Sequence, residues 1–154
     1  MRILSFAAAV ALFACNALAA GPAWHIEKLP DNAPLFQQSG CMGSFSPKGH
    51  GADVVFLDDG VDVKAKANIK LGGKIFALDL VSTKASGKQG ADSAGLGAHF
   101  DRVFKDKAGA VTVVESITVT AEHPEADSTE EKGTLTVTYQ GTTQKVEIEG
   151  GTAC

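Results

Sequence analysis

The stretch VDVKAKANIKL, residues 61–71, decides the fold class that we expect for this chain. Apolar or small residues alternate in it with charged or polar ones without interruption. An apolar period of two is typical of a β-strand with one buried and one solvated face, because successive side chains point to opposite sides. The residues predicted to face the core are Val61, Val63, Ala65, Ala67, Ile69 and Leu71.

Similar strands are predicted on both sides of this stretch. The segment ADVVFLDDGV precedes it, with a turn at Asp59-Gly60, and KIFALDLVS follows the turn at Gly72-Gly73. Both dipeptides tolerate the positive φ angles that tight hairpin turns require. We therefore predict three antiparallel strands joined by hairpins.

Four more strands are predicted in the second half of the chain. They are HFDRVFKD, AVTVVESITVTAEH, TLTVTYQ and QKVEIEG, with turns at Lys107-Ala108-Gly109 and at Gly141. Val114 and Glu115 interrupt the alternation of the second of them, which predicts a β-bulge or a bend near there. About seven hairpin-linked strands predict an all-β domain, because each strand must hide its apolar face. The architecture expected is an antiparallel β-sandwich or a small barrel.

The N-terminus has the pattern of a secretory signal peptide. Arg2 is followed by an apolar run from Ile3 to Ala14 that is too short to anchor the chain in a bilayer, and Ala17 and Ala19 form an A-x-A cleavage motif. We therefore predict a signal peptide over residues 1–19. A single β domain is expected over residues 20–154, with residues 20–50 as an irregular segment packed on it.

Cys15 offers an alternative to simple cleavage, since Leu12 to Cys15 resembles a lipoprotein motif that would make Cys15 a lipid anchor. Phe13 is bulky where that motif usually has a small residue, which favours cleavage. Both interpretations predict an exported protein. It is expected to be periplasmic or secreted, or else an outer-membrane lipoprotein.

The cysteine content predicts a single disulfide. Of the three cysteines, Cys15 is removed with the signal peptide or acylated, which leaves Cys41 and Cys154. Two thiols in an oxidising compartment are expected to pair. Two reduced thiols or a metal-binding pair are the alternatives, and no C-x-x-C spacing supports the second of them.

Composition and charge narrow the class of partner. The chain has 14 basic and 18 acidic residues and a formal net charge of −4. A mildly acidic protein is not expected to bind nucleic acid, nor to dock on anionic lipid by charge alone. Beyond the signal peptide, no apolar run is long enough to predict a transmembrane segment.

The sequence offers no catalytic motif. It contains neither a G-x-S-x-G nucleophile elbow nor an H-E-x-x-H zinc motif. The adjacent carboxylates Asp58 and Asp59 are explained by the predicted hairpin turn. We therefore expect a protein that is not an enzyme and that needs no cofactor.

One segment that escapes the strand pattern is the main candidate for function. KASGKQGADSAGLGA, residues 84–98, is rich in Gly, Ser and Ala, and loops of this length in small domains often bind ligands. The side chains expected to contact a ligand there are Lys88, Gln89, Asp92 and Ser93. Trp24 is a further candidate, either as a plug over an open end of the domain, which we favour, or as an exposed anchor for a partner.

The first hypothesis is therefore an exported, non-catalytic module that binds or inhibits a protein, a glycan or an envelope component through the 84–98 loop. A metal-binding protein is the alternative. Calcium would bind in the acidic segment 122–131, or copper or zinc would bind in the irregular segment near residue 50. The candidate calcium ligands are Glu122, Glu125 and Asp127, and the candidate copper or zinc ligands are Met42 and His50. A solvated acidic loop is the plainer interpretation of residues 122–132.

Overall fold

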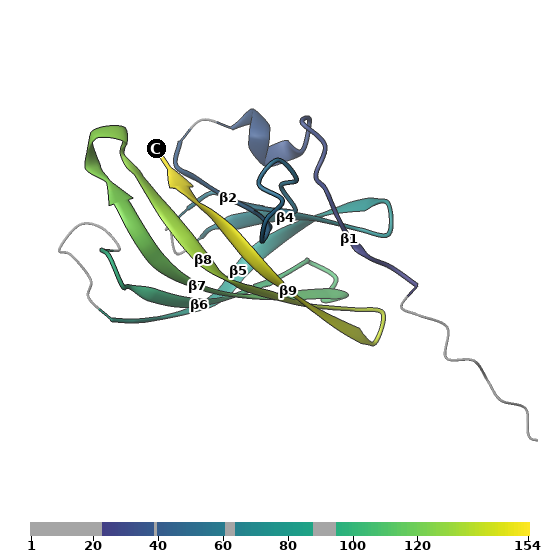
Figure 1. Ribbon diagram of the computed structural model, residues 1–154. Coiled ribbons are helices and arrows are strands. Elements are labelled where there is room, and N and C mark those ends of the chain that lie inside the picture. The colour runs from purple at the N-terminus through teal and green to yellow at the C-terminus, as the bar shows by residue number, and fades with distance from the viewer. Residues whose placement is uncertain (1–22, 39, 61–63, 88–94) are drawn as a thin grey trace, which may run out of the picture.

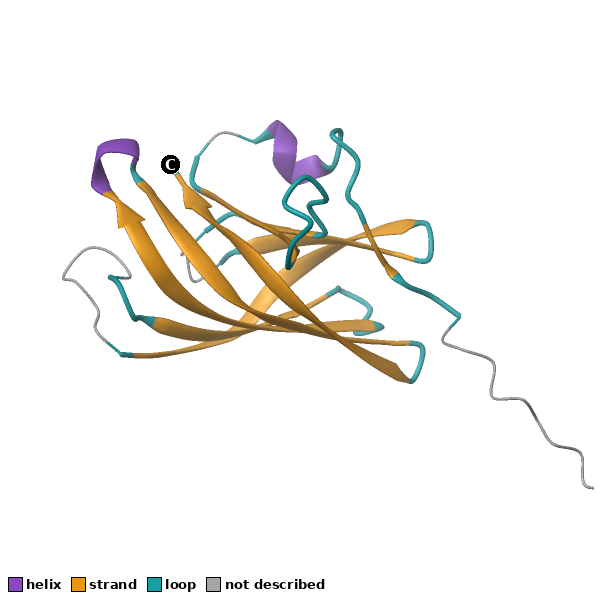
Figure 2. Ribbon diagram, in the orientation of Figure 1, coloured by secondary structure: helices purple, strands orange, loops and turns teal. Residues whose placement is uncertain are grey.

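The computed structural model describes residues 23–38, 40–60, 64–87 and 95–154, and they form an all-β fold (Figures 1 and 2). Its strands are β1 (Ile26–Glu27), β2 (Met42–Pro47), β3 (Phe56–Asp58), β4 (Lys66–Leu71), β5 (Lys74–Ser86), β6 (His99–Lys105), β7 (Val111–His123), β8 (Ser128–Tyr139) and β9 (Thr142–Ala153). Two short 3-10 helices, η1 (Pro34–Gln37) and η2 (Pro124–Ala126), complete the described elements. The prediction of an all-β, hairpin-rich fold is confirmed.

Eight of the strands close into an antiparallel barrel. The order around it is β4, β3, β2, β9, β8, β7, β6 and β5, and β5 pairs again with β4. β1 is an extra strand that pairs with the last two residues of β4, Ile26 with Leu71 and Glu27 with Lys70. Of the two architectures expected, the barrel is therefore the correct one.

The barrel interior is packed with side chains. The strand that decided the fold class places Ala67, Ile69 and Leu71 inside, as the alternation predicted. Aromatic and β-branched residues from the other strands fill the remaining space. Phe45, Phe56, Phe104, Val113, Val137 and Ile148 are all buried there. Eight strands enclose a space just wide enough for such side chains.

Trp24 closes one end of the barrel. Its side chain is 2% exposed, and its indole Nε1 donates a 2.9 Å hydrogen bond to the carbonyl oxygen of Tyr139. Gln144 Nε2 donates in turn to the carbonyl oxygen of Trp24 at 2.7 Å. Trp24 is therefore buried as expected for the plug that we favoured, and it is not the exposed anchor of the alternative.

The N-terminal segment covers the outer surface of β3 and β4. Leu29, Ala33 and Leu35 form a second buried cluster with Leu57. The backbone N–H of Leu35 donates a 3.0 Å hydrogen bond to the side-chain Oδ1 of Asn68. The outer face of β4, which the alternation assigned to solvent, is therefore partly covered, and Asn68 is 2% exposed.

Two strands lie in the segment expected to be irregular. β2 was missed because its sequence, MGSFSP, is rich in residues with low strand propensity. Gly43 is needed there because a Cβ at this position would lie 2.6 Å from Oδ2 of Asp58. Tertiary packing therefore determines this strand. β1 is only two residues long, too short for an alternating pattern.

Two local predictions about turns have opposite outcomes. Gly72 and Gly73 have φ angles of +54° and +81° and join β4 to β5, so the predicted hairpin turn is confirmed. The predicted tight turn at Asp59-Gly60 is wrong, because β3 ends at Asp58 and β4 begins only at Lys66. Val61 and Val63, which were predicted to face the core, lie outside the described residues.

The predicted bulge near Glu115 is also wrong. Alternation along β7 continues from Val111 to Val119, with Glu115 on the interior face and completely buried. The irregularity in the pairing of β7 with β8 lies further on, between Val119 and Ala121. The carboxylate had been assumed to point outward, whereas it points into the barrel.

Candidate functional site

Four charged residues lie inside the barrel. They are Asp58 on β3, Arg102 on β6, Glu115 on β7 and Glu131 on β8, and none is more than 6% exposed. Charged side chains are almost never buried unless they are paired. The group, which we call the interior charge cluster, therefore requires an account of its partners.

Arg102 and Asp58 form the best-bonded part of the cluster. The two guanidinium Nη atoms of Arg102 lie 3.3 and 3.4 Å from the two carboxylate oxygens of Asp58. Nη1 also donates to the carbonyl oxygen of Gly60 at 3.1 Å, and the N–H of Gly60 donates to Asp58 Oδ1 at 2.8 Å. Burial raises the pKa of Asp58, and Arg102 opposes that rise.

Glu115 has fewer partners than Asp58. Its Oε2 lies 2.7 Å from Nε of Arg102, although the N–H does not point directly at the oxygen, so the contact is an ion pair without a well-aligned hydrogen bond. Its Oε1 has no hydrogen-bond partner among the described residues. Burial raises the pKa of Glu115 to about 8 even though Arg102 opposes the rise. Burial therefore favours the protonated form of Glu115, whereas the contact with Arg102 favours the charged form.

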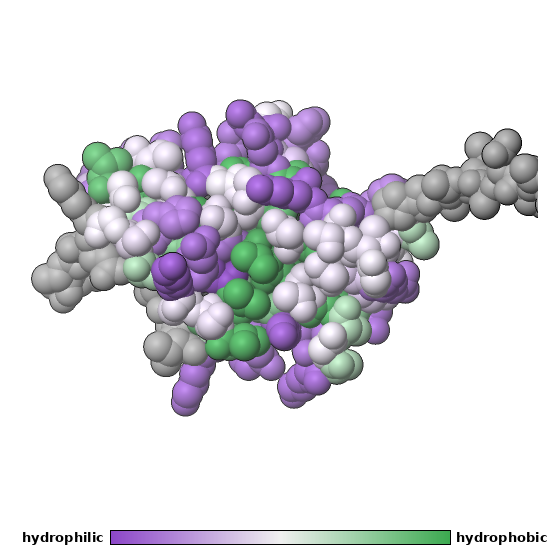
Figure 3. All heavy atoms as spheres, turned by 90° about the horizontal axis from the view of Figure 1, so that it is seen from below, coloured by the Kyte–Doolittle hydropathy of each residue, from purple (hydrophilic) through white to green (hydrophobic). Residues whose placement is uncertain are grey.

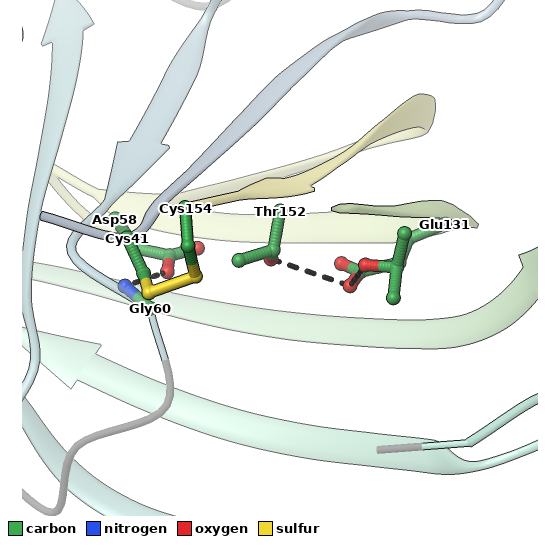
Figure 4. The surroundings of a disulfide bond; sticks show 7 residues. Cys41, Asp58, Gly60, Glu131, Thr152 and Cys154 are labelled. Carbon is green, nitrogen blue, oxygen red and sulfur yellow. Dashed lines mark hydrogen bonds between the residues drawn. A yellow bond between two sulfur atoms is a disulfide. The ribbon is translucent and has the colours of Figure 1, made fainter. Parts of the chain in front are cut away.

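Glu131 completes the cluster from β8. Its Oε1 accepts hydrogen bonds from Thr129 Oγ1 at 2.8 Å and from Thr152 Oγ1 at 3.3 Å, the second of which is drawn in Figure 4. Burial raises the pKa of Glu131, and the hydrogen bond from Thr129 opposes the rise. For Arg102, burial acts to lower the pKa, but Glu115, Asp58 and Glu131 together raise it.

From the raised pKa of Glu115 we predict that the protein becomes less stable as pH rises through the neutral range. Because the pKa of Glu115 is raised from 4.5 to about 8, the folded protein keeps a proton that the unfolded chain releases above pH 4.5. The free energy of unfolding should therefore fall as pH rises from about 5 to 8, by up to about 1.4 kcal/mol per pH unit, and level off above 8. Urea denaturation at one-unit steps from pH 5 to 9 measures the slope.

The Glu115→Gln variant is the control for that measurement, because an amide of the same shape does not titrate. We expect its stability to change much less between pH 5 and 8 than that of the wild type. Asp58 and Glu131, whose pKa values are also raised, supply the remaining slope. An equal slope in both proteins would show that Glu115 is ionised throughout this range.

The disulfide lies beside the interior charge cluster. Cys41, just before β2, is bonded to Cys154, just after β9, so the predicted pairing is confirmed. Figure 4 shows the bond next to Asp58 and Gly60. Gly60 has a φ of +87°, and a Cβ on it would lie 3.3 Å from Cβ of Cys41. The bond therefore ties the start of β2 to the end of β9 at the end of the barrel where the cluster lies.

The predicted binding residues of the 84–98 segment are only partly described. Lys88, Gln89, Asp92 and Ser93 lie outside the described residues, within 88–94. Lys84 to Ser86 belong to β5, so they do not form a loop as we expected. At the other end of the segment, the N–H of Gly97 donates to the carbonyl oxygen of Val119 at 2.9 Å, and Ala98 is fully buried.

The last part of β5 has a neighbour on one side only. β4 pairs with β5 as far as Asp79, and the N–H of Leu80 donates to the carbonyl oxygen of Ala65. β6 pairs with β5 as far as Ser86. Among the described residues no strand pairs with the other side of residues 81–86, which we call the β5 edge. All six of its residues are exposed, Val81 by 58%.

The outer surface next to the β5 edge is partly hydrophobic. Val103 on β6 pairs with Val114 on β7, and both alternate with buried residues, so they lie on the outer face. Ser82 of the β5 edge pairs with Val103 from the other side. The underside of the barrel, where β6 and β7 lie in Figure 1, shows a narrow hydrophobic band between hydrophilic residues (Figure 3).

A histidine, an aspartate and a serine meet on the outer face of β6 and β7. His99 Nε2 lies 3.3 Å from Asp101 Oδ1 and 3.4 Å from Ser116 Oγ, while its Nδ1 lies 2.9 Å from Thr118 Oγ1. A catalytic triad needs the acid and the nucleophile on opposite ring nitrogens. Here both lie at Nε2, and a hydrogen bond from Ser116 lowers the pKa of Asp101. The arrangement therefore does not activate a serine.

The metal hypothesis gains no support from the described residues. β8 begins at Ser128, so the acidic segment is mostly strand and only residues 124–127 reverse the chain. Within the described part of the chain, no three His, Cys, Asp or Glu residues are grouped so that they could hold a metal ion. Of the predicted calcium ligands, Glu122 lies on β7, and Glu125 and Asp127 lie in this reversal. Of the predicted copper or zinc ligands, Met42 lies on β2 and His50 lies in the turn after it.

Comparisons with known protein families, with curated proteins and with solved structures found no significant similarity to this chain. Within the described residues, no helix is long and apolar enough to cross a membrane.

Proposed function

We propose that this chain is an exported, non-catalytic binding module that contacts a partner protein with the end of the β5–β6 hairpin. Export is supported by the signal-peptide pattern of residues 1–19 and by the disulfide, since such bonds persist in oxidising compartments. A binding role is supported by the contrast between a densely packed barrel interior and the exposed residues 81–86 at the end of β5.

The single observation that carries the proposal is the exposure of the β5 edge. Asp79 of β5 pairs with Lys66, the first residue of β4. β5 continues for seven residues beyond Asp79, as far as Ser86. Exposed edges are sites at which proteins bind other chains, and natural barrels usually avoid them by closing completely. The exposure of residues 81–86, with no strand among the described residues paired to their outer side, favours a role in contacting another molecule.

Site-specific photocrosslinking in the producing cells tests the proposal. A photoreactive amino acid at Lys84, in the middle of the β5 edge, is expected to form one adduct of defined mass on irradiation. The same amino acid at Lys145, which is exposed on β9, is the matched control and should form none. Adducts at both positions, or at neither, would contradict the proposal.

Intact mass measured on the same preparation tests export separately. We expect a chain that begins at Ala20 and carries the Cys41–Cys154 bond. An acylated Cys15 would instead support the lipoprotein alternative. A chain that retains residues 1–19 would contradict export with cleavage.

A further inference from the structure

We infer that a groove on the outer face of β4 and β5 binds a small amphipathic anion, that is, an apolar molecule with one acidic group. We call it the η1 groove, because η1 forms one of its walls. Its lining includes Leu35 of η1, Ile75 and Ala77 of β5, and Lys107 in the turn between β6 and β7. These residues lie outside the β5 edge, so this site does not depend on the proposed function.

The two walls of the η1 groove are held in place by hydrogen bonds. On one side, the N–H of Leu35 donates to Asn68 Oδ1 on β4 at 3.0 Å. On the other side, the N–H of Val111 donates to Asp106 Oδ1 at 2.8 Å, which closes the turn that carries Lys107. A preformed site loses little conformational entropy when a ligand enters it, and this favours the binding of a small molecule.

The floor of the η1 groove is apolar. Ile75 and Ala77 point outward from β5, because they alternate with the buried residues Phe76 and Leu78. Ala77 is exposed, and its small side chain leaves room above the floor between η1 and the turn at residues 106–108. The groove has a volume of about 560 Å³, which lies within the range of sites for small ligands.

Positive charge exceeds negative charge in the lining of the η1 groove. Three lysines and two aspartates line it, which leaves an excess of one positive charge in a chain whose formal net charge is −4. Lys66 of β4 donates a hydrogen bond to Asp79 of β5, and this bond lowers the pKa of Asp79. The charge of Lys107 lowers it further, so two ammonium groups act on one carboxylate. A second anionic group, supplied by a ligand, is therefore attracted to this end of the groove.

The apolar floor and the cationic end together define the class of ligand. Contact with Ile75 and Ala77 removes apolar surface of the ligand from water, which is a favourable and non-directional contribution to binding. An acidic group beside Lys107 adds an ionic contribution, which is small and falls as salt rises because Lys107 is exposed. A neutral apolar compound gains only the first contribution, and a purely ionic compound such as phosphate gains only the second.

A matched pair of naphthalene compounds tests this inference. Naphthalene-2-carboxylate and naphthalene-2-carboxamide have similar shapes, and only the first is charged. Each is titrated into ¹⁵N-labelled mature protein, and binding is followed by the chemical shifts of the backbone amides. We expect saturable binding of the carboxylate, with the largest shifts at residues 75–79 and 106–108. The carboxamide should shift the same amides and bind about threefold more weakly.

Two variants change the η1 groove at exposed positions. Ala77→Glu places a carboxylate on the floor, and we expect it to weaken the binding of naphthalene-2-carboxylate about tenfold. Lys107→Gln should weaken the binding of the carboxylate to the level of the carboxamide and leave that of the carboxamide unchanged. Ala126→Glu and Lys145→Gln are the matched controls, because these exposed residues of η2 and β9 lie outside the lining. Both controls should bind as the wild type does.

Three results would overturn this inference. Shifts spread over the whole protein, or a titration that does not saturate, would exclude a site in the η1 groove. Equal affinity of the wild type for the two compounds would show that no acidic group is recognised. Unchanged binding by Lys107→Gln, or by Ala77→Glu with a wild-type melting temperature, would place the ligand elsewhere. The photocrosslink at Lys84 tests the proposed function separately, so the two proposals fail independently.

Discussion

Replacement of Arg102 by methionine is expected to lower the free energy of unfolding by about 3–5 kcal/mol at pH 7. Methionine has a similar length, but it removes the only cation of the interior charge cluster. The Asp58 carboxylate would lose both Nη contacts, and Glu115 would lose its one close contact with a donor nitrogen. Urea denaturation followed by the fluorescence of Trp24, which is buried at the barrel end, measures the change.

Two further variants show whether an unpaired charge causes this loss. Combining Arg102→Met with Asp58→Asn removes the carboxylate that loses both of its guanidinium contacts, and the double variant should recover much of the lost stability. Arg102→Lys keeps one charge but cannot contact both carboxylates through a planar fork, so an intermediate stability is expected. If Arg102→Met alone were as stable as the wild type, the cluster would contribute nothing to stability.

Removal of the disulfide is expected to have an effect of similar size. The bond joins residues 113 positions apart in the sequence, so it restricts most of the unfolded chain. On the chain-entropy model, the double variant Cys41→Ala/Cys154→Ala should lose about 4–5 kcal/mol of unfolding free energy. The urea midpoint of this variant, compared with that of the oxidised wild type, measures the difference.

Reduced wild-type protein is the matched control, because it breaks the same bond without changing the sequence. The two proteins should unfold at similar urea concentrations. A loss of less than about 1 kcal/mol in both would show that this end of the barrel is held mainly by the pairing of β2 with β9.

The strands of this fold were predictable where hydrophobic alternation is local and complete. The stretch 61–71 placed Ala67, Ile69 and Leu71 in the core correctly, because their pattern needs no information from distant residues. β2 could not be found in this way. Its glycine and serine residues give no apolar period, and only the close approach of Asp58 to Gly43 explains them.

The interior charge cluster was missed because polar residues in a strand were assumed to face water. Arg102 and Glu115 each occupy a core position of an otherwise apolar face, and they pair directly across β6 and β7. Two opposite charges at matching positions of one hairpin are a usable signal that the sequence does contain. The participation of Asp58 was not predictable, because it comes from β3 and its neighbour Asp59 suggested a turn.

The surface that we propose for binding was partly predictable. Low apolar content predicted a loop over residues 84–98, but Lys84 to Ser86 continue β5, and residues 88–94 lie outside the described part of the chain. In the part of the chain that the structure describes, β5 extends beyond the residue at which β4 begins. Where β4 begins is not specified by local sequence.

Amide hydrogen exchange, resolved by residue, tests the central claim that the β5 edge is open on one side. The claim predicts an alternating pattern between Val81 and Ser86: amides that point toward β6 exchange slowly, and those that point away exchange fast. Uniform protection across these six residues would show that another segment covers the edge, and would contradict the account.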